Sequence, residues 1–113
     1  PVSTFYDSSA APDPQVWLST SSQQQLRLVR NFYAQARNGG VGKLHVLLHS
    51  NVETRIARGH GPTTKAMFRL QSRGLSRQEA ISAICQALLK VGVDDVPGRA
   101  TLETEENLAL NQL

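Results

Sequence analysis

Residues 76–92, SRQEAISAICQALLKVG, decide the fold class of this chain. The stretch opens with Ser76 and has Glu79 three residues later, which is the capping box that satisfies free amides at a helix N-terminus. Apolar residues then recur at helical spacings, and Gly92 is a typical stop signal. The stretch therefore predicts a helix so apolar that other helices must cover it.

Working outward from this stretch, three more segments show a helical period. They cover residues 21–37, 41–57 and 63–72. Glycine follows the second and third segments, at Gly59 and Gly74, where a left-handed residue can close a helix. No stretch alternates apolar and polar residues as a half-buried strand does. We therefore predict an all-α fold, a compact bundle of four principal helices.

The two ends of the chain have weaker patterns. Residues 1–20 are expected to form an N-terminal arm with a short helical turn, because Asp13 can cap a helix that starts at Pro14. Trp17 is the large apolar group that would dock this arm on the core. Residues 93–113 are expected to form a loosely attached C-terminal tail, whose second half is compatible with a short helix.

Length and composition are those of one domain. All 113 residues are assigned to a single helical domain whose core is residues 21–92. No apolar run approaches the ~20 residues that cross a bilayer, and no signal peptide is expected. Cys85 is the single cysteine, so an intramolecular disulfide is excluded and a cytoplasmic location is favoured. Since it lies in an apolar helix, we expect an inert structural thiol.

The charge is modestly basic, with a formal net charge of +3. Three arginines, Arg69, Arg73 and Arg77, lie in one basic stretch and are candidates for nucleic-acid or anion contact. Such residues would touch phosphates without reading a base sequence. A solvated basic surface is the simpler interpretation, so nucleic acid is the less favoured partner.

The strongest pattern with chemical meaning is His45-x-x-x-His49-x-x-x-Glu53 in the segment 41–57. Spacings of four place the three side chains on one side of a helix, and two imidazoles one turn apart can share a metal ion. His45 and Glu53 lie ~12 Å apart along the axis, so an ion would need one adjacent pair and ligands from another helix. Glu79 is the candidate carboxylate there. The alternative interpretation is a pair of histidines that hydrogen-bond to neighbours or water.

Five groups of residues occur together between positions 6 and 90: Tyr6-Asp7, Ala11-Pro12-Asp13-Pro14 with Trp17-Leu18, Leu28-Val29, His45-x-x-x-His49-x-x-x-Glu53, and Gly74-Leu75-Ser76-Arg77-Gln78-Glu79-Ala80-Ile81. This combination resembles a family of small bacterial helical proteins of unknown function. The resemblance implies a helical fold and a bacterial, cytoplasmic origin. It also implies a site that is reduced or lost here, because the family tends to have histidine where this chain has Tyr33, Gln78 and Ser82.

No complete catalytic or cofactor motif is present, so a non-enzymatic binding or interaction module is the favoured function. Leu102, Leu108 and Leu110 predict a homo-oligomer or a protein partner that docks through residues 101–113. The alternative is a metal-binding or metal-dependent hydrolase-like protein, with a reduced His/Glu site between the helices of residues 41–57 and 76–92. A divalent metal is the cofactor that this alternative implies. A weak nucleic-acid binder is the third possibility.

Overall fold

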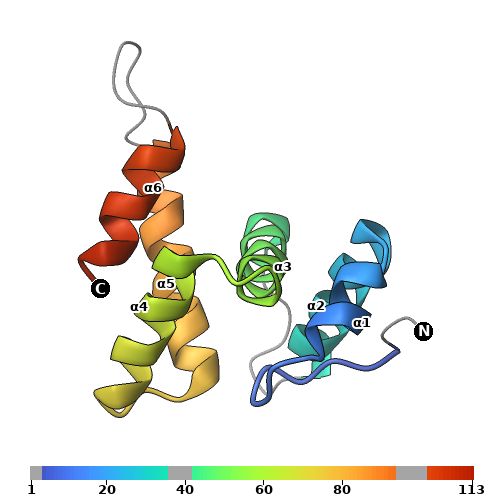
Figure 1. Ribbon diagram of the computed structural model, residues 1–113. Coiled ribbons are helices and arrows are strands. Elements are labelled where there is room, and N and C mark those ends of the chain that lie inside the picture. Colours follow the sequence, from blue (N-terminus) through green and yellow to red (C-terminus); the bar gives the residue numbers. More distant parts are fainter. Residues whose placement is uncertain (1–3, 36–41, 94–101) are drawn as a thin grey trace.

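The computed structural model describes residues 4–35, 42–93 and 102–113, and in these ranges every regular element is an α-helix (Figure 1). The helices follow one another as α1 (Pro14–Ser19), α2 (Ser22–Gln35), α3 (Lys43–Ala57), α4 (Gly61–Ser72), α5 (Arg77–Val93) and α6 (Leu102–Asn111). The all-helical, compact fold class is thereby confirmed. None of the helices in the described part of the chain is long and apolar enough to cross a membrane.

Local sequence signals explain where the helices begin and end. The Asp13 carboxylate accepts a hydrogen bond from the amide of Val16 at 3.1 Å and caps α1 as predicted. The predicted capping box of α5 is complete, since the Ser76 amide donates to Glu79 and the Glu79 amide donates to Ser76. Gly92 does not end α5, which continues to Val93.

Two glycines close helices in the left-handed conformation. Gly59 follows α3 with φ 73°, and Gly74 follows α4 with φ 100°. A side chain at either position would be strained, because L-residues rarely adopt positive φ. The turn at Gly74 reverses the chain between α4 and α5, and the turn at Gly59 leads the chain from α3 across to α4 (Figure 1).

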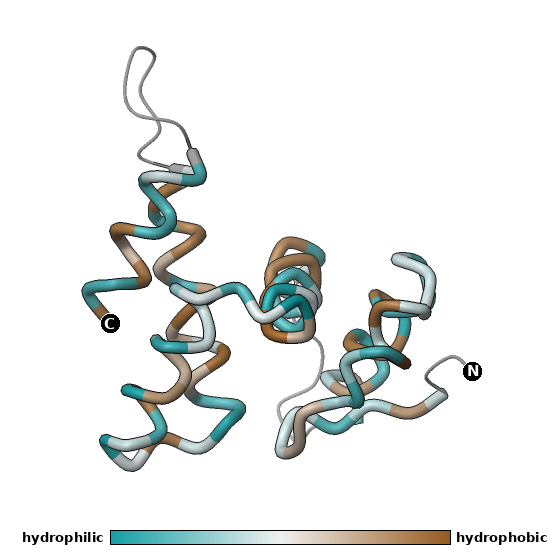
Figure 2. Tube along the Cα trace, viewed as in Figure 1, coloured by the Kyte–Doolittle hydropathy of each residue, from teal (hydrophilic) through white to brown (hydrophobic). Residues whose placement is uncertain are grey.

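Helix α3 lies between two groups of helices, with α1 and α2 on one side and α4, α5 and α6 on the other (Figure 1). Val52 of α3 joins the larger apolar core with α4, α5 and α6, whereas Val46 joins a second core with α1, α2 and the arm. Figure 2 shows apolar segments in both groups and in α3 between them. In place of one core enclosed by four helices, the described residues form two cores on opposite sides of α3.

For residues 102–113 the expectation of a loosely attached tail is wrong, whereas residues 94–101 of that tail lie outside the described residues. Helix α6 packs against α4 and α5, and the side chain of Leu110 is completely buried there. Arg69 donates hydrogen bonds to the backbone oxygens of Leu110 and Leu113, at 2.9 and 3.2 Å. The short predicted helix therefore exists and belongs to the core, because its apolar face covers α4 and α5.

Candidate functional site

A buried polar cluster lies along one face of α3. His49 and Glu53, one helical turn apart, are both completely buried. Tyr6 of the arm and Tyr33 of α2 contribute hydroxyl groups, and Arg77 contributes a guanidinium from the first turn of α5. Three segments, the arm, α2 and the start of α5, therefore meet at α3.

Glu53 is the charged centre of the cluster. Both of its oxygens accept hydrogen bonds from Arg77, each 2.7 Å long, and one of them also accepts from the Tyr6 hydroxyl. Arg77 donates further to the backbone oxygen of Ser8 at 3.1 Å. A bidentate pair of this kind satisfies a buried carboxylate that would otherwise be very unfavourable.

His49 lies between the two tyrosines. Its Nε2 is 2.6 Å from the Tyr6 hydroxyl, and its Nδ1 is 2.6 Å from the Tyr33 hydroxyl. Since the single Tyr6 hydroxyl proton goes to Glu53, Nε2 of His49 must donate to Tyr6. Nδ1 of the neutral ring then accepts the proton of Tyr33. The cluster therefore holds His49 in one tautomer.

The hydrogen bonds of Tyr33 extend the network to the edge of the cluster. The Tyr33 oxygen, having given its proton to His49, accepts from Nε2 of His45 at 2.9 Å and from the amide of Gln78 at 3.2 Å. The result is one directed chain of hydrogen bonds from the half-buried His45, through Tyr33, His49 and Tyr6, to Glu53. Among the described residues, no buried nitrogen or oxygen of the two tyrosines, His49 or Glu53 lacks a partner.

Burial sets the protonation states within this chain. Desolvation, with smaller contributions from His45 and Arg77, lowers the pKa of His49 to about 3. Burial and then the charge of Glu53 raise the pKa of Tyr6, and burial raises the pKa of Tyr33. Burial alone would lower the pKa of Arg77, but its hydrogen bonds and attraction to Glu53 raise it. At neutral pH the His49 ring and the two tyrosines are therefore neutral, beside the ion pair of Arg77 and Glu53.

The structure brings together three of the four predicted metal ligands. His45, His49 and Glu53 belong to the hydrogen-bond chain, but Glu79 is exposed and hydrogen-bonds to Ser76 in the capping box. No group of three or more His, Cys, Asp and Glu side chains in the described ranges is placed to hold a metal ion. Arg77 takes the position beside Glu53 that a second-helix ligand would need.

The three positions at which the resembling family tends to have histidine also converge. Tyr33 and Gln78 are hydrogen-bonded to each other, and Ser82 contributes a hydrogen bond that lowers the pKa of Tyr33 against the effect of burial. All three therefore surround the imidazole pair of α3. Of the three, Tyr33 is the one that hydrogen-bonds to the imidazoles, at 2.9 Å from His45 and 2.6 Å from His49.

Sequence reasoning did not identify Tyr6 as a member of the cluster and assigned Arg77 to a surface. Tyr6 is 43 and 47 residues from its partners His49 and Glu53. The motif Tyr6-Asp7 has no spacing that indicates such a contact. No local signal could have found it, because the contact depends on how the arm crosses α3.

The predicted anion-contact arginines are engaged within the fold. Arg69 and Arg73 donate to the last backbone oxygens after α6, with Arg73 at 2.6 Å from that of Leu113. These arginines satisfy carbonyl groups at a helix C-terminus. Arg77 is paired with Glu53, so each of the three guanidinium groups has a partner within the fold.

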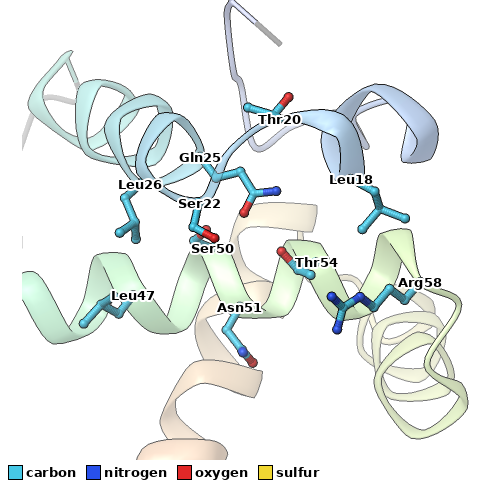
Figure 3. Close-up of a pocket in the computed structure, with 10 residues that line it drawn as sticks. All are labelled: Leu18, Thr20, Ser22, Gln25, Leu26, Leu47, Ser50, Asn51, Thr54 and Arg58. Carbon is cyan, nitrogen blue, oxygen red and sulfur yellow. The ribbon is translucent and has the colours of Figure 1, made fainter. Parts of the chain in front are cut away.

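A groove runs between α3 and the corner where α1 meets α2 (Figure 3). Its wider part has a volume of about 370 Å³. Leu26 and Leu47 point toward each other across it, while the Arg58 guanidinium lies at the other end (Figure 3). Leu26 and Leu47 also line an adjoining pocket of about 310 Å³, together with Val46, Arg30 and Lys43. We call these two joined pockets the α3 groove.

The rim of the α3 groove is held by hydrogen bonds. The Trp17 indole donates to the hydroxyl of Thr54 at 3.2 Å, which joins α1 to α3. The Gln25 amide donates to the backbone oxygen of Trp17 at 2.8 Å, which joins α2 to α1. The groove therefore has a preformed shape, as ligand sites usually do.

Comparison with known proteins yields no match to any family model, curated protein or solved structure. Fold similarity therefore indicates no function for this chain. The buried cluster and the α3 groove are the features that bear on its function.

Proposed function

We propose that this protein is a non-enzymatic binding module whose α3 groove receives a segment of another protein. The observation that supports this proposal most is that α3 has a buried polar face and, apart from it, residues that line an open groove. One face of the helix is occupied by the buried cluster around His49 and Glu53, and a different set of α3 residues, including Leu47 and Asn51, lines the open groove.

The cluster has the properties of a structural element. Its hydrogen bonds join the arm, α2 and α5 to α3, and no buried nitrogen or oxygen of Tyr6, Tyr33, His49 or Glu53 lacks a partner among the described residues. At its edge, Oε1 of Gln78 is buried without a partner. Networks whose central groups are satisfied in this way rigidify a fold. We therefore assign to the cluster the role of holding α1, α2 and α3 in place around the groove.

The groove has the properties of a recognition site. It combines aliphatic side chains, Leu18, Leu26 and Leu47, with the polar groups of Ser50 and Thr54. Leu18 and Leu47 are 43% and 50% exposed, which is high for leucine in a folded chain. Apolar concave surfaces with a few polar groups are the usual form of a binding site.

Selection from a random peptide library tests this proposal. The wild-type protein should enrich peptides, and the same selection with Leu47→Glu should not enrich them. Phe68→Glu is the matched control, because Phe68 is 74% exposed but lies outside the groove. If no enriched peptide depends on Leu47, the proposed function is wrong.

Among the described side chains, a docking role for residues 101–113 is supported by one exposed leucine, Leu108. Of the leucines that motivated it, Leu110 is buried in the core and Leu108 is exposed. An oligomer formed through this segment would therefore depend on Leu108 and its neighbours on α6. Mass in solution before and after Leu108→Glu tests it, and an unchanged mass at high concentration would eliminate it.

The second candidate function is metal binding, favoured by one specific contact. Nε2 of His45 and Nδ1 of His49 both approach the Tyr33 oxygen, at 2.9 and 2.6 Å. Two nitrogens that converge on one point can bind a metal if the tyrosine moves aside. Protein purified without an affinity tag would then contain stoichiometric metal. Substoichiometric metal, together with no thermal shift on adding zinc, manganese or iron, would exclude this candidate.

The cellular setting remains a proposal from the sequence. One free cysteine, Cys85, is buried in α5, and a reduced thiol fits a cytoplasmic location. Burial raises the pKa of this thiol to about 12, so it is not a nucleophile at neutral pH.

A further inference from the structure

We infer that the α3 groove binds an acidic, amphipathic helical segment of a partner protein. This inference rests on the proposed function and specifies the chemistry of the ligand. Its basis is the distribution of charge and apolar surface along the groove.

Positive charge lies at both ends of the groove. Arg30 and Lys43 line one end and Arg58 lines the other. All three side chains are exposed, and none forms an ion pair within the described ranges. Among the described residues, no carboxylate lines either pocket of the groove. Glu103 and Glu106 line a separate pocket beyond Arg58, so an anionic ligand that stays within the groove would meet no repulsion from its lining.

The surface between the charges is apolar. Leu26 and Leu47 lie where the two pockets join, and Leu18 continues the apolar surface toward Arg58. Nucleic acid does not match this arrangement, because a phosphate backbone calls for a continuous basic track. A peptide with aliphatic side chains on one face and carboxylates near both ends matches it.

The length of the groove favours a helical ligand. Lys43 is the first residue of α3 and Arg58 directly follows its last, so the two lie fifteen positions apart, a span of about 22 Å at 1.5 Å per residue. A ligand helix of about 15 residues covers the same distance. Amphipathic helices commonly dock in this manner, with apolar residues at positions i, i+3, i+4 and i+7 in the groove.

Polar groups on the groove wall are also preorganised. The Thr54 hydroxyl already accepts from the Trp17 indole, so its own proton is directed elsewhere. Ser50 lies one turn earlier on the same side of α3. These hydroxyls offer hydrogen bonds to the polar margin of a bound helix.

The test uses two synthetic 16-residue peptides with the same leucine face. One has glutamates in its first and last turns, and the other has lysines at those positions. We expect the acidic peptide to bind wild-type protein in a fluorescence anisotropy titration, and the basic peptide not to bind. Lys43→Glu and Arg58→Glu should each weaken binding roughly tenfold, because each replaces an attractive charge at the rim of the groove with a repulsive one. Leu47→Glu should abolish binding.

Lys65→Glu is the matched control. It makes the same change of charge at an exposed residue of α4 outside the groove, and binding should be unchanged. If Lys65→Glu weakens binding as much as Lys43→Glu, the attraction is nonspecific and the inference is overturned. Thermal unfolding of each variant checks that the fold is retained, which is expected because these side chains are exposed.

Other outcomes separate this inference from the proposed function. Library peptides that need Leu47 but lack carboxylates would overturn the acidic ligand and leave the binding module standing. No ligand that depends on Leu47 would overturn both. A wild-type dimer that Leu47→Glu converts to a monomer would identify a second copy as the occupant and overturn a partner from another protein.

Discussion

The guanidinium of Arg77 forms two hydrogen bonds of 2.7 Å with the carboxylate of Glu53, although the two residues are 24 positions apart. Glu53 is completely buried, and the Arg77 side chain is 10% exposed. This pair fixes the first turn of α5 against the middle of α3. Through Tyr6 and Ser8 it also fixes the arm.

Glu53→Gln should strongly destabilise the protein. The substitution removes one charge of a buried pair and leaves Arg77 uncompensated, which typically costs about 3–5 kcal/mol. Urea unfolding gives the free energy of unfolding for this variant. Glu106→Gln is the control, because Glu106 pairs with Arg55 at 2.7 Å with side chains 18% and 19% exposed. That loss should stay below about 1 kcal/mol, and equal losses would contradict the role assigned to Glu53.

Stability should decrease as the pH falls from about 6.5. The pKa of His49 is 6.5 as an ordinary value and about 3 in the fold. Between these values the unfolded chain binds the extra proton, so the free energy of unfolding falls by up to about 1.4 kcal/mol per pH unit. The window from about pH 6.5 to 4.5 is cleanest, since most carboxylates titrate below it.

His49→Gln is the comparison for this pH effect. Glutamine can still donate to Tyr6 and accept from Tyr33, but it cannot take up a proton. The variant should lack the part of the slope that His49 contributes. If the stability curves of wild-type protein and His49→Gln run parallel between pH 6.5 and 4.5, His49 is not held neutral by burial.

Neutral His49 should carry its proton on Nε2. Nitrogen NMR distinguishes the two tautomers of an imidazole directly. Tyr33→Phe removes the donor to Nδ1 of His49. It also removes the hydroxyl group to which His45, His49 and Gln78 all hydrogen-bond. We expect a loss of about 1–3 kcal/mol in the free energy of unfolding and a weaker tautomer preference. An Nδ1-protonated His49 in the wild type would refute the order of hydrogen bonds derived above.

Leu110→Ala should destabilise the protein by about 2–5 kcal/mol, the usual cost of truncating a buried leucine. Leu110 is completely buried between α6 and its neighbours, whereas Leu108 on the same helix is 53% exposed. Leu108→Ala should therefore change stability by less than about 0.5 kcal/mol. Chemical denaturation of both variants measures the difference, and similar small losses would show that α6 is not part of the core.

Cys85 should react with iodoacetamide only when the protein unfolds. The thiol is 1% exposed, and burial raises its pKa to about 12, so little thiolate exists near pH 8. Mass spectrometry should detect slow labelling in buffer and rapid labelling in denaturant. Ser72→Cys in a Cys85→Ala background is the control, because position 72 is exposed. Equal labelling rates of the two thiols in the native protein would contradict the burial of Cys85.

Part of the candidate site follows from sequence alone. The spacing of His45, His49 and Glu53 predicted one helical face, and the structure places all three in one hydrogen-bond chain. The spacing could not distinguish metal ligands from hydrogen-bonded groups. That distinction depends on Tyr33 and Arg77, which arrive from other helices.

The sequence by itself determined the helices, their caps and the left-handed turns at Gly59 and Gly74. Such features depend on atoms within about four residues of one another, so local spacing is sufficient. Only the tertiary structure decided that Arg77 pairs with Glu53, that Tyr6 reaches α3, and that α6 is docked. These contacts join residues 24 to 51 positions apart. They follow from the burial of many side chains at once, which no single stretch of sequence encodes.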